Sequence, residues 1–307
     1  MRILFMGTPE FAVPSLEVLL AEHDVVAVVT QPDRRAGRGQ KYVYSPIKEV
    51  ALKHNVPILQ PERIGKPQVM DELEGYNADL FVVVAFGQKI PDRLLAMPRF
   101  GCVNVHSSLL PKYRGAAPIN KAIVEGETIT GVTTMYMGSG WDDGDIILQA
   151  EENILPRDTA GSLHDRLMMK GAALLSETVR LIAAGQAPRT AQNHNEATFA
   201  FKLTKEDGWV DFQRTAEELD CLIRGMNPWP VAHTIIGGET VKIWEAYPQE
   251  KSGQVGEILA VDSEGLLVCC GSGSLYLRKI QRPNSKVISG SDFANGLRLR
   301  IGDFLQR

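Results

Sequence analysis

Residues 78–86, Ala-Asp-Leu-Phe-Val-Val-Val-Ala-Phe, form an almost continuous apolar run of strand length. Such a run indicates a β-strand that is buried on both faces, because a strand with one face in water alternates apolar and polar side chains. Further strand-like segments lie at 2–7, 24–30, 101–107 and 131–137, and helix-like segments lie at 9–22, 45–55, 117–126 and 158–185. This alternation predicts an α/β fold with a Rossmann-like, mainly parallel sheet that helices cover.

The pattern changes after about residue 188. Residues 188–208 are polar and lack long apolar runs, which is typical of a linker. A helix-like segment at 215–226 is then followed by short strand-like segments that glycines and polar turns separate. Short strands at close spacing indicate a small, OB-like β-barrel. We therefore predict an N-terminal domain at 1–189, a linker at 190–208 and a C-terminal β-barrel domain at 209–307.

The composition excludes several classes of protein. A hydrophobic fraction of 44% and a charged fraction of 23% are ordinary for a globular protein, and a net charge of −4 is not that of a nucleic-acid-binding polycation. The four cysteines lack Cys-x-x-Cys or Cys/His spacing, so we expect free thiols and no metal site. Neither a signal-peptide pattern nor an apolar run of membrane-spanning length is evident, so we expect a cytoplasmic protein with no membrane partner.

Residues 31–41 form a basic segment directly after a predicted strand. One acidic residue, Asp33, stands against four basic ones: Arg34, Arg35, Arg38 and Lys41. One interpretation is an ordinary solvated loop. The other is a flexible loop that closes over a phosphate backbone, since ligands of open α/β sheets bind at the carboxyl ends of strands. The segment alone leaves both interpretations open.

Asn104 and His106 interrupt the apolar strand predicted at 101–107. Because they are two residues apart on a strand, their side chains point to the same face. An amide and an imidazole at the end of a buried strand are either a hydrogen-bonded core pair or polar groups that face a ligand. The strand alone does not decide between these two interpretations.

A second polar cluster follows the next predicted strand, where Asp142, Asp143 and Asp145 lie within the segment 138–146. The three acids could be solvated turn residues or a calcium site, although the twelve-residue spacing that ends in Glu is missing. A carboxylate from this loop could also reach His106, orient its ring and pair with its protonated form. Amide, imidazole and carboxylate together suit acyl transfer, which needs donors for an oxyanion and an acceptor for a proton.

The segments NVHSSLLPKYRGAAP, at 104–118, and DDGDI, at 142–146, resemble motifs of the folate-dependent formyltransferases. Further segments resemble, in order, those members of the family that formylate methionine on initiator tRNA: GTPEFAVPSL, TQPDRRAGRGQK, SPIKEVA, KLTKEDGWVDF and IRGMNPWPVAHT. The resemblance extends from residue 1 to about residue 250 and is weaker beyond it. At 138–141 the chain departs from it, with Gly-Ser-Gly-Trp where the family is usually more apolar.

The resemblance implies roles for individual residues of this chain. The implied catalytic residues are Asn104, His106 and Asp142. Folate binding is implied for the Ser-Leu-Leu-Pro motif and for two neighbouring loops: Ser108, Leu109, Leu110, Pro111, Phe86, Gln88, Ile90, Gly138 and Asp142. Binding of tRNA is implied for the basic segment 31–41, with Arg34, Arg38 and Lys41.

The C-terminal segment 271–307 is basic, unlike the chain as a whole. It holds seven basic residues against two acidic ones. A basic β-barrel fits contact with an RNA backbone, and we expect Arg278 and Lys279 to contribute. Ordinary solvated surface is the alternative interpretation.

The activity that the resemblance implies is transfer of a formyl group from 10-formyltetrahydrofolate, a co-substrate, to the α-amino group of initiator Met-tRNA. The family's habit implies a monomer that needs no metal. Alternatives on the same scaffold are a formyltransferase with another acceptor, such as a nucleotide or an amino sugar, and a hydrolase that releases formate from formyltetrahydrofolate. Segment 31–41 and the basic C-terminal segment favour tRNA as the acceptor. The presence of Asn104, His106 and Asp142 disfavours a non-catalytic RNA-binding module.

Overall fold

The computed structural model describes residues 1–36 and 41–305, without the side chains of Arg35, Ala36 and Lys41. Packing of the backbone divides the chain into two compact units. The first comprises Met1–Gly115, Ile129–Asn153 and His164–Ala200, and the second comprises Ala116–Thr128, Ile154–Leu163 and Phe201–Arg307.

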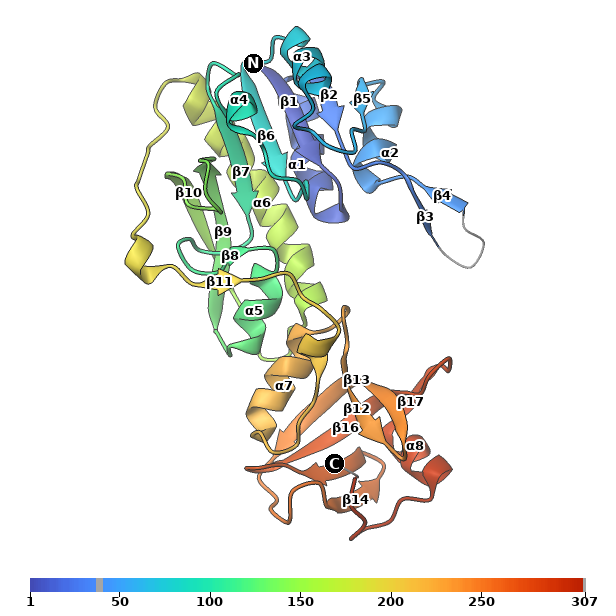
Figure 1. Cartoon of the computed structure of the whole chain (residues 1–307). Helices are drawn as coiled ribbons and strands as arrows, with labels where there is room; N and C mark the ends of the chain where they lie inside the picture. The colour runs from blue at the N-terminus through green and yellow to red at the C-terminus, as the bar shows by residue number, and fades with distance from the viewer. Residues whose placement is uncertain (37–40, 306–307) are drawn as a thin grey trace. The chain divides into compact units, whose positions relative to one another are not determined.

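The first unit is built on a seven-stranded sheet in the order β10-β9-β7-β6-β1-β2-β5 (Figure 1). Its strands are β1 (Arg2–Gly7), β2 (Asp24–Val29), β5 (Ile58–Leu59), β6 (Leu80–Val84), β7 (Cys102–His106), β9 (Ile129–Tyr136) and β10 (Ile146–Asn153). The strands from β7 to β5 are parallel, whereas β9 is antiparallel to β7 and β10 is antiparallel to β9. Strand β6 lies within the apolar run 78–86 and is buried along its whole length.

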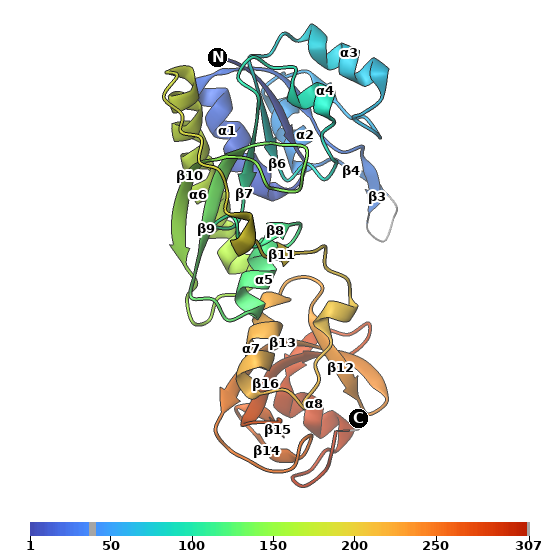
Figure 2. The ribbon, with the colours of Figure 1, turned by 60° about the vertical axis from the view of Figure 1, so that its left-hand side comes forward.

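Helices cover both faces of this sheet. They are α1 (Val13–Glu22, after a 3-10 turn at Glu10–Ala12), α2 (Pro46–Lys53), α3 (Pro67–Gly75), α4 (Asp92–Leu95) and α6 (Ala160–Ala183). The face that carries Cys102 packs against α3 through Leu73 and against α4 through Leu94. Helices α1 and α6 lie on the opposite side of the sheet (Figures 1 and 2), where Gly171 of α6 is next to Val105. The predicted mainly parallel α/β fold is confirmed.

The sequence pattern does not predict β10. Its side chains alternate between partly covered and exposed, because it is the edge strand of the sheet and one of its faces meets solvent. The polar residues on that exposed face, Gln149, Glu151 and Asn153, remove the apolar signal on which the prediction of the other strands depends. The strand is important for the site, because the chain must reverse between β9 and β10 and the reversal carries Asp142.

The basic segment 31–41 contains β3 (Arg34–Ala36) and the first residue of β4 (Lys41–Val43), and these two short strands pair as an antiparallel hairpin. Arg38 lies outside the described residues, and so does the side chain of Lys41. At the base of the hairpin the Lys48 ammonium pairs with Asp33, and the Gln60 amide donates to Asp33 over 2.8 Å. These hydrogen bonds, first from Lys48 and then from Gln60, lower the pKa of Asp33. The one acid of the segment therefore anchors the hairpin.

The second unit contains a six-stranded antiparallel sheet in the order β12-β13-β16-β15-β14, with β17 paired to β16. Its strands are β12 (Ala232–Ile236), β13 (Glu239–Gln249), β14 (Ile258–Asp262), β15 (Gly265–Cys269), β16 (Ser274–Gln281) and β17 (Val287–Ser289), and its helices are α5 (Pro118–Val124), α7 (Ala216–Gly225) and α8 (Gly290–Leu297). Leu219 and Ile223 of α7 and Phe293 of α8 pack into the apolar core on this sheet. The prediction of a small β domain after the α/β domain is confirmed, and the structure shows that its sheet is antiparallel.

The segment 190–208, which the sequence suggests as a linker, has local structure of its own. It includes the 3-10 turns η2 (His194–Glu196) and η3 (Glu206–Gly208) and the short strand β11 (Phe199–Ala200). β11 pairs in parallel with β8 (Arg114–Gly115), which follows β7 in the chain. Within the residues that the structure describes, no helix has the length and apolar character needed to cross a membrane.

Candidate active site

Strand β7 places Asn104 and His106 on the sheet face that also carries Cys102. Both side chains are buried, with 9% of Asn104 and 6% of His106 exposed. Near its start, β7 presents Cys102 to α4, and burial raises the pKa of that thiol to about 12, so it is not a nucleophile at neutral pH. Further along the strand the same face turns polar, and the segments 113–115 and 138–144 cover it in place of a helix.

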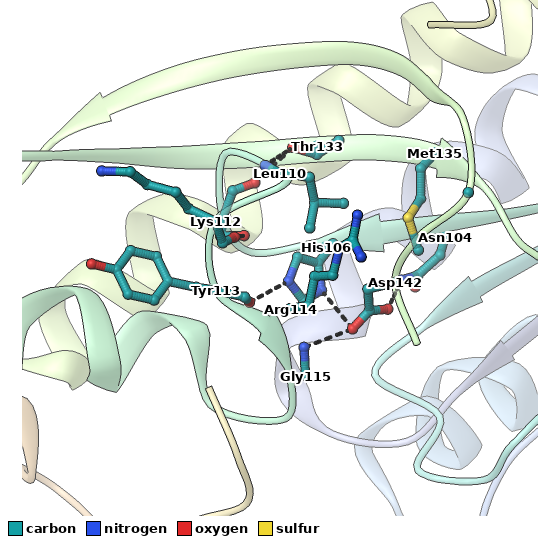
Figure 3. Close-up of polar contacts among 12 residues, drawn as sticks. Asn104, His106, Leu110, Lys112, Tyr113, Arg114, Gly115, Thr133, Met135 and Asp142 are labelled. Carbon is teal, nitrogen blue, oxygen red and sulfur yellow. Dashed lines mark hydrogen bonds and ion pairs between the residues drawn. The ribbon is translucent and has the colours of Figure 1, made fainter. Parts of the chain in front are cut away.

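Asp142 brings its carboxylate to both of these side chains (Figure 3). One oxygen, Oδ1, is 3.5 Å from Asn104 Nδ2, and the other, Oδ2, is 3.7 Å from His106 Nδ1. These separations are long for hydrogen bonds, as is common for catalytic groups without substrate. The Gly115 N–H donates to Oδ2 over 2.8 Å, which fixes the carboxylate directly. The structure therefore brings together the three residues for which the sequence predicts catalytic roles.

The ring of His106 is oriented by a backbone group. Its Nε2 lies 2.9 Å from the carbonyl oxygen of Tyr113, and a carbonyl oxygen can only accept, so Nε2 carries a proton. The other ring nitrogen, Nδ1, is therefore the atom that faces Asp142. The carboxylate next to Nδ1 is placed to stabilise an imidazolium ion, a donor suited to an oxyanion.

Asp142 reaches the site from a strand that runs antiparallel to β7. Because β9 is antiparallel to β7, its end at Tyr136 lies beside Val103, away from the carboxyl end of β7. The loop 138–145 then folds back over Asn104, with Asp142 in a left-handed backbone conformation at φ 48°. Within the described part of the chain, no group of three His, Cys, Asp or Glu side chains is placed to hold a metal ion, so Asp142, Asp143 and Asp145 do not converge on one site.

The departure from the family at 138–141 has a local explanation. The Asp143 carboxylate folds back over the loop, so that a side chain at Gly140 would come within 1.9 Å of it and one at Gly138 within 3.3 Å. Trp141 points outward and is 70% exposed. The glycines therefore make room for Asp143, while the position of Asp142 is set by its own contacts.

The motif Ser108–Pro111 is held by β9 and β10. Thr133 donates its hydroxyl to the Ser108 carbonyl over 2.7 Å and accepts from the Leu110 N–H over 3.1 Å. Gln149 donates to the Leu110 carbonyl over 2.9 Å, and Leu109 packs on Gly131. The Ser108 hydroxyl is turned inward to the Lys112 carbonyl. The loop is thus rigid, and the groups that it offers to a ligand are those of its backbone and of Pro111.

The loop after β6 is similarly fixed. Phe86 and Ile90 bury their side chains in the apolar core under α3 and α4. The Gln88 amide is used by the chain itself, since it accepts from the Ile64 N–H and donates to the Pro61 carbonyl. Between them Gly87 is exposed, with φ at 82°. Contacts from this loop to a pterin ring would therefore come from the backbone and not from the three side chains named from sequence.

Four residues that sequence reasoning misses complete the site: Tyr113, Gly115, Thr133 and Gln192. Tyr113 and Gly115 contribute through backbone atoms, for which the side-chain sequence gives no signal. Gln192 lies in the polar segment interpreted as a linker, yet it is buried beside the Asp142 loop. A buried polar side chain in a polar segment has no pattern that would mark it.

The basic residues named from sequence differ in their surroundings. Arg34 is exposed at the start of the β3–β4 hairpin. In the second unit, Arg278 pairs with Glu264, and Lys279 lies 2.5 Å from Glu245. These two pairs line a cavity of about 530 Å³ next to β17. The positive charges of Arg278 and Lys279 are therefore largely compensated within the protein.

Comparison with known proteins agrees with this geometry. Residues 1–179 match the family model described as formyl transferase, and residues 202–298 match the one described as formyl transferase, C-terminal domain. The chain resembles a solved structure of an N-formyltransferase from Helicobacter canadensis with folinic acid and dTDP-3-aminofucose, at 21% identity and a TM-score of 0.67, over 92% of this chain and 99% of the other. It also resembles HypX from Aquifex aeolicus with tetrahydrofolic acid, at 17% identity and a TM-score of 0.63, over 100% of this chain and 51% of the other. At this identity the likeness concerns the fold.

Relatives of higher identity cover nearly the whole chain. The methionyl-tRNA formyltransferase of Geobacter metallireducens is 45% identical over 98% of this chain and 97% of its own length. The enzyme of the same name from Geobacter sulfurreducens is 46% identical over 98% of this chain and 96% of its own length, and that from Clostridioides difficile is 45% identical over 98% and 99%. The chain therefore belongs to the methionyl-tRNA formyltransferase family.

Proposed function

We propose that the protein transfers the formyl group of 10-formyltetrahydrofolate to the α-amino group of methionine on initiator tRNA, as a monomer in the cytoplasm. The observation that supports this most directly is the placement of the Asp142 carboxylate, with one oxygen 3.5 Å from Asn104 Nδ2 and the other 3.7 Å from His106 Nδ1. Family membership supplies the substrates. Formyl transfer as such requires only donors for an oxyanion and a proton acceptor, and this arrangement offers both.

The uncharged amine attacks the formyl carbon, so that a carbon–nitrogen bond forms and the formyl oxygen becomes an oxyanion. Asn104 Nδ2 and protonated His106 Nδ1 donate to that oxygen, while Asp142 accepts the proton that the amine loses, directly or through water. The intermediate then collapses, the bond from carbon to N10 of the folate breaks, and N10 leaves with the proton that Asp142 had accepted from the amine, returned directly or through water. Donors that are already oriented stabilise the intermediate without the cost of reorienting water, which lowers the barrier.

The folate co-substrate fits between two fixed loops. Solved structures of the same fold are complexes with folinic acid or with tetrahydrofolic acid. In this chain, we assign the pterin side to the backbone of 86–90 and to Gly138, and the opposite wall to Ser108–Pro111. Planar rings with several donors and acceptors are well matched by backbone amides and carbonyls, which these loops present without flexible side chains.

The assignment is tested by incubating the protein with 10-formyltetrahydrofolate and methionine-charged initiator tRNA, followed by detection of formyl-methionine. Omitting the tRNA and measuring formate tests the hydrolase alternative, and a nucleotide-linked amino sugar tests the other formyl acceptors. We expect formyl-methionine with charged initiator tRNA and little formate without it. Formate release at a comparable rate without tRNA would instead identify a hydrolase.

For the tRNA, we propose contacts from the exposed face of the β3–β4 hairpin and from basic residues of the second unit that have no internal partner. Lys286, Arg298 and Arg300 have no ion-pair partner among residues 1–36 and 41–305, in contrast to Arg278 and Lys279. A phosphate that approaches Lys279 must compete with Glu245, whereas one that approaches Lys286 meets an uncompensated charge.

We therefore expect the tRNA affinity to fall steeply with salt concentration, and Lys286→Ala to reduce the slope of log K against log salt by about 1, as for the loss of one phosphate contact. Lys279→Ala, on a neighbouring strand, is the matched control and should change the slope by less. Filter binding across a salt series measures both. A flat salt profile, or equal effects of the two variants, would contradict this assignment.

A further inference from the structure

Gln192 is a buried side chain of the first unit that contacts the loop carrying Asp142. Only 6% of it is exposed, although its neighbours Asn193 and His194 are exposed. Its amide nitrogen Nε2 donates to two backbone carbonyls of the loop, those of Asp142 and Gly144, each over 2.8 Å. Both hydrogen atoms of the Gln192 amide group are thus donated to the segment that carries the Asp142 carboxylate.

Arg114 determines which way this amide points. Its Nε and Nη2 both donate to Gln192 Oε1, over 3.1 and 2.7 Å. A guanidinium group can only donate, so the atom that faces Arg114 must be the amide oxygen, and the NH₂ group must face Asp142 and Gly144. Arg114 is itself buried and also contacts His194 Nδ1 over 3.2 Å. The oxygen and the NH₂ group of the Gln192 amide therefore cannot exchange places.

The loop needs such support. Asp142 has a left-handed backbone conformation, φ 48°, which is unfavourable for a residue with a side chain. Gly144 approaches the backbone of Tyr136 so closely that an added side-chain carbon would lie 1.8 Å from its carbonyl oxygen. The two carbonyls that Gln192 binds flank the turn between these constrained positions. Without these two hydrogen bonds from Gln192, the loop could relax and move the Asp142 carboxylate away from His106.

The same part of the chain also holds the other side of the site. Thr198 accepts from the Tyr113 N–H through its hydroxyl, over 2.9 Å, and from the Arg114 N–H through its carbonyl, over 2.9 Å. Tyr113 in turn orients His106, and Gly115 holds the Asp142 carboxylate. Segment 192–200 therefore supports both the segment that orients the His106 ring and the loop that carries Asp142.

We propose that Gln192 is a positioning residue for formyl transfer: its amide, directed by Arg114, holds the loop that presents Asp142 to Asn104 and His106. The inference rests on the proposed function, because it assigns to Gln192 a role that acts through Asp142. It adds to the site a residue from the segment that sequence reasoning assigns to a linker, more than 45 residues beyond Asp142.

The sharpest test is Gln192→Glu. The carboxylate keeps its partner Arg114, but it has no N–H to donate and places an oxygen against the carbonyls of Asp142 and Gly144. We expect kcat to fall about 10- to 100-fold, as for small displacements of catalytic groups, with KM for the folate and the tRNA and the unfolding midpoint close to wild type. Asn193→Ala, the adjacent exposed position whose side chain contacts Asn195 and Glu196, is the matched control and should leave kcat unchanged.

A double-mutant cycle distinguishes positioning from a general structural role. If Gln192 acts through Asp142, then Gln192→Glu should have almost no further effect on kcat in an Asp142→Asn background. Additive losses, a kcat within twofold of wild type, or a loss of kcat matched by a higher KM and a lower unfolding midpoint would each overturn the proposal. If the Glu variant does not fold, Gln192→Met, which keeps the length and buries no charge, takes its place in the cycle.

Hydrogen exchange separates this proposal from the proposed function. Amides of 138–145 should exchange faster in Gln192→Glu than in wild type or Asn193→Ala, whatever reaction the protein catalyses. If the wild-type protein forms no formyl-methionine but this exchange pattern is observed, the proposed function fails while the role of Gln192 in holding the loop stands. Unchanged exchange in the loop would refute that role directly.

Discussion

His106→Ala is expected to lower kcat about 10²–10³-fold, the typical cost of removing one donor from an oxyanion site, with KM for the folate donor close to wild type. The reason is that His106 Nδ1 faces the reaction centre beside Asp142, while the proposed folate contacts come from other loops. Asp142→Asn should cause a loss of similar size. Its amide oxygen can still accept from the Gly115 N–H, but the group no longer accepts a proton from the amine.

Single-turnover formylation at saturating folate and Met-tRNA measures these losses without a contribution from product release. Asp145→Asn is the matched control, because Asp145 lies in the same loop but its side chain contacts Arg189, 3.5 Å away, and not the site. We expect Asp145→Asn to remain within about twofold of wild type, as for a surface ion pair. Near-normal turnover of either His106→Ala or Asp142→Asn would refute the assignment of the catalytic residues.

The sequence predicts the frame of the site because that frame depends on local patterns. Continuous apolar runs identify the central parallel strands, and the two-residue spacing of Asn104 and His106 places both on one face. These signals need no knowledge of distant contacts. A polar pair on a buried strand is also rare enough to attract attention, since its burial has to be compensated by partners.

What the sequence does not predict depends on contacts between distant residues. The route of Asp142 follows from the reversal of β9 against β7, which no local pattern encodes. Gln192 reaches its partners across 50 and 48 residues. A count of basic residues in the sequence treats Lys279 as a free charge. In the structure Lys279 lies directly opposite Glu245 in the register of β13 and β16 and pairs with it. A count of charges cannot show such cross-strand pairs.

The buried network around Asp220 in the second unit provides the prediction with the largest effect on stability. Asp220 accepts from Arg157 over 2.9 Å and from Arg224 over 2.7 Å, and only 8% of its side chain is exposed. Arg157 also donates to the Ala246 carbonyl and stacks on the Tyr247 ring, 3.9 Å from its centroid. One carboxylate is thus the shared counter-charge of two guanidinium groups that connect α7, β13 and the segment 154–163 of the same unit.

Asp220→Ala is expected to destabilise the second unit by roughly 3–5 kcal/mol, because it leaves two guanidinium groups without their shared counter-charge. Arg157 is 40% exposed and can recover some hydration, so we expect the lower part of that range. Urea unfolding followed by tryptophan fluorescence suits this test, since Trp209, Trp229 and Trp244 all belong to the second unit, and only Trp141 belongs to the first.

The matched control is Glu264→Ala, which also removes the carboxylate partner of an arginine in this unit, Arg278, but at a position that is 59% exposed. A surface pair of this kind contributes about 0–1 kcal/mol, so its midpoint should move little. The contrast between the two variants compares a buried carboxylate that two arginines share with an exposed carboxylate that pairs with one arginine. Equal shifts would mean that Asp220 contributes no more than a surface charge, and that the apolar core formed by α7, α8 and the sheet carries the stability of the second unit by itself.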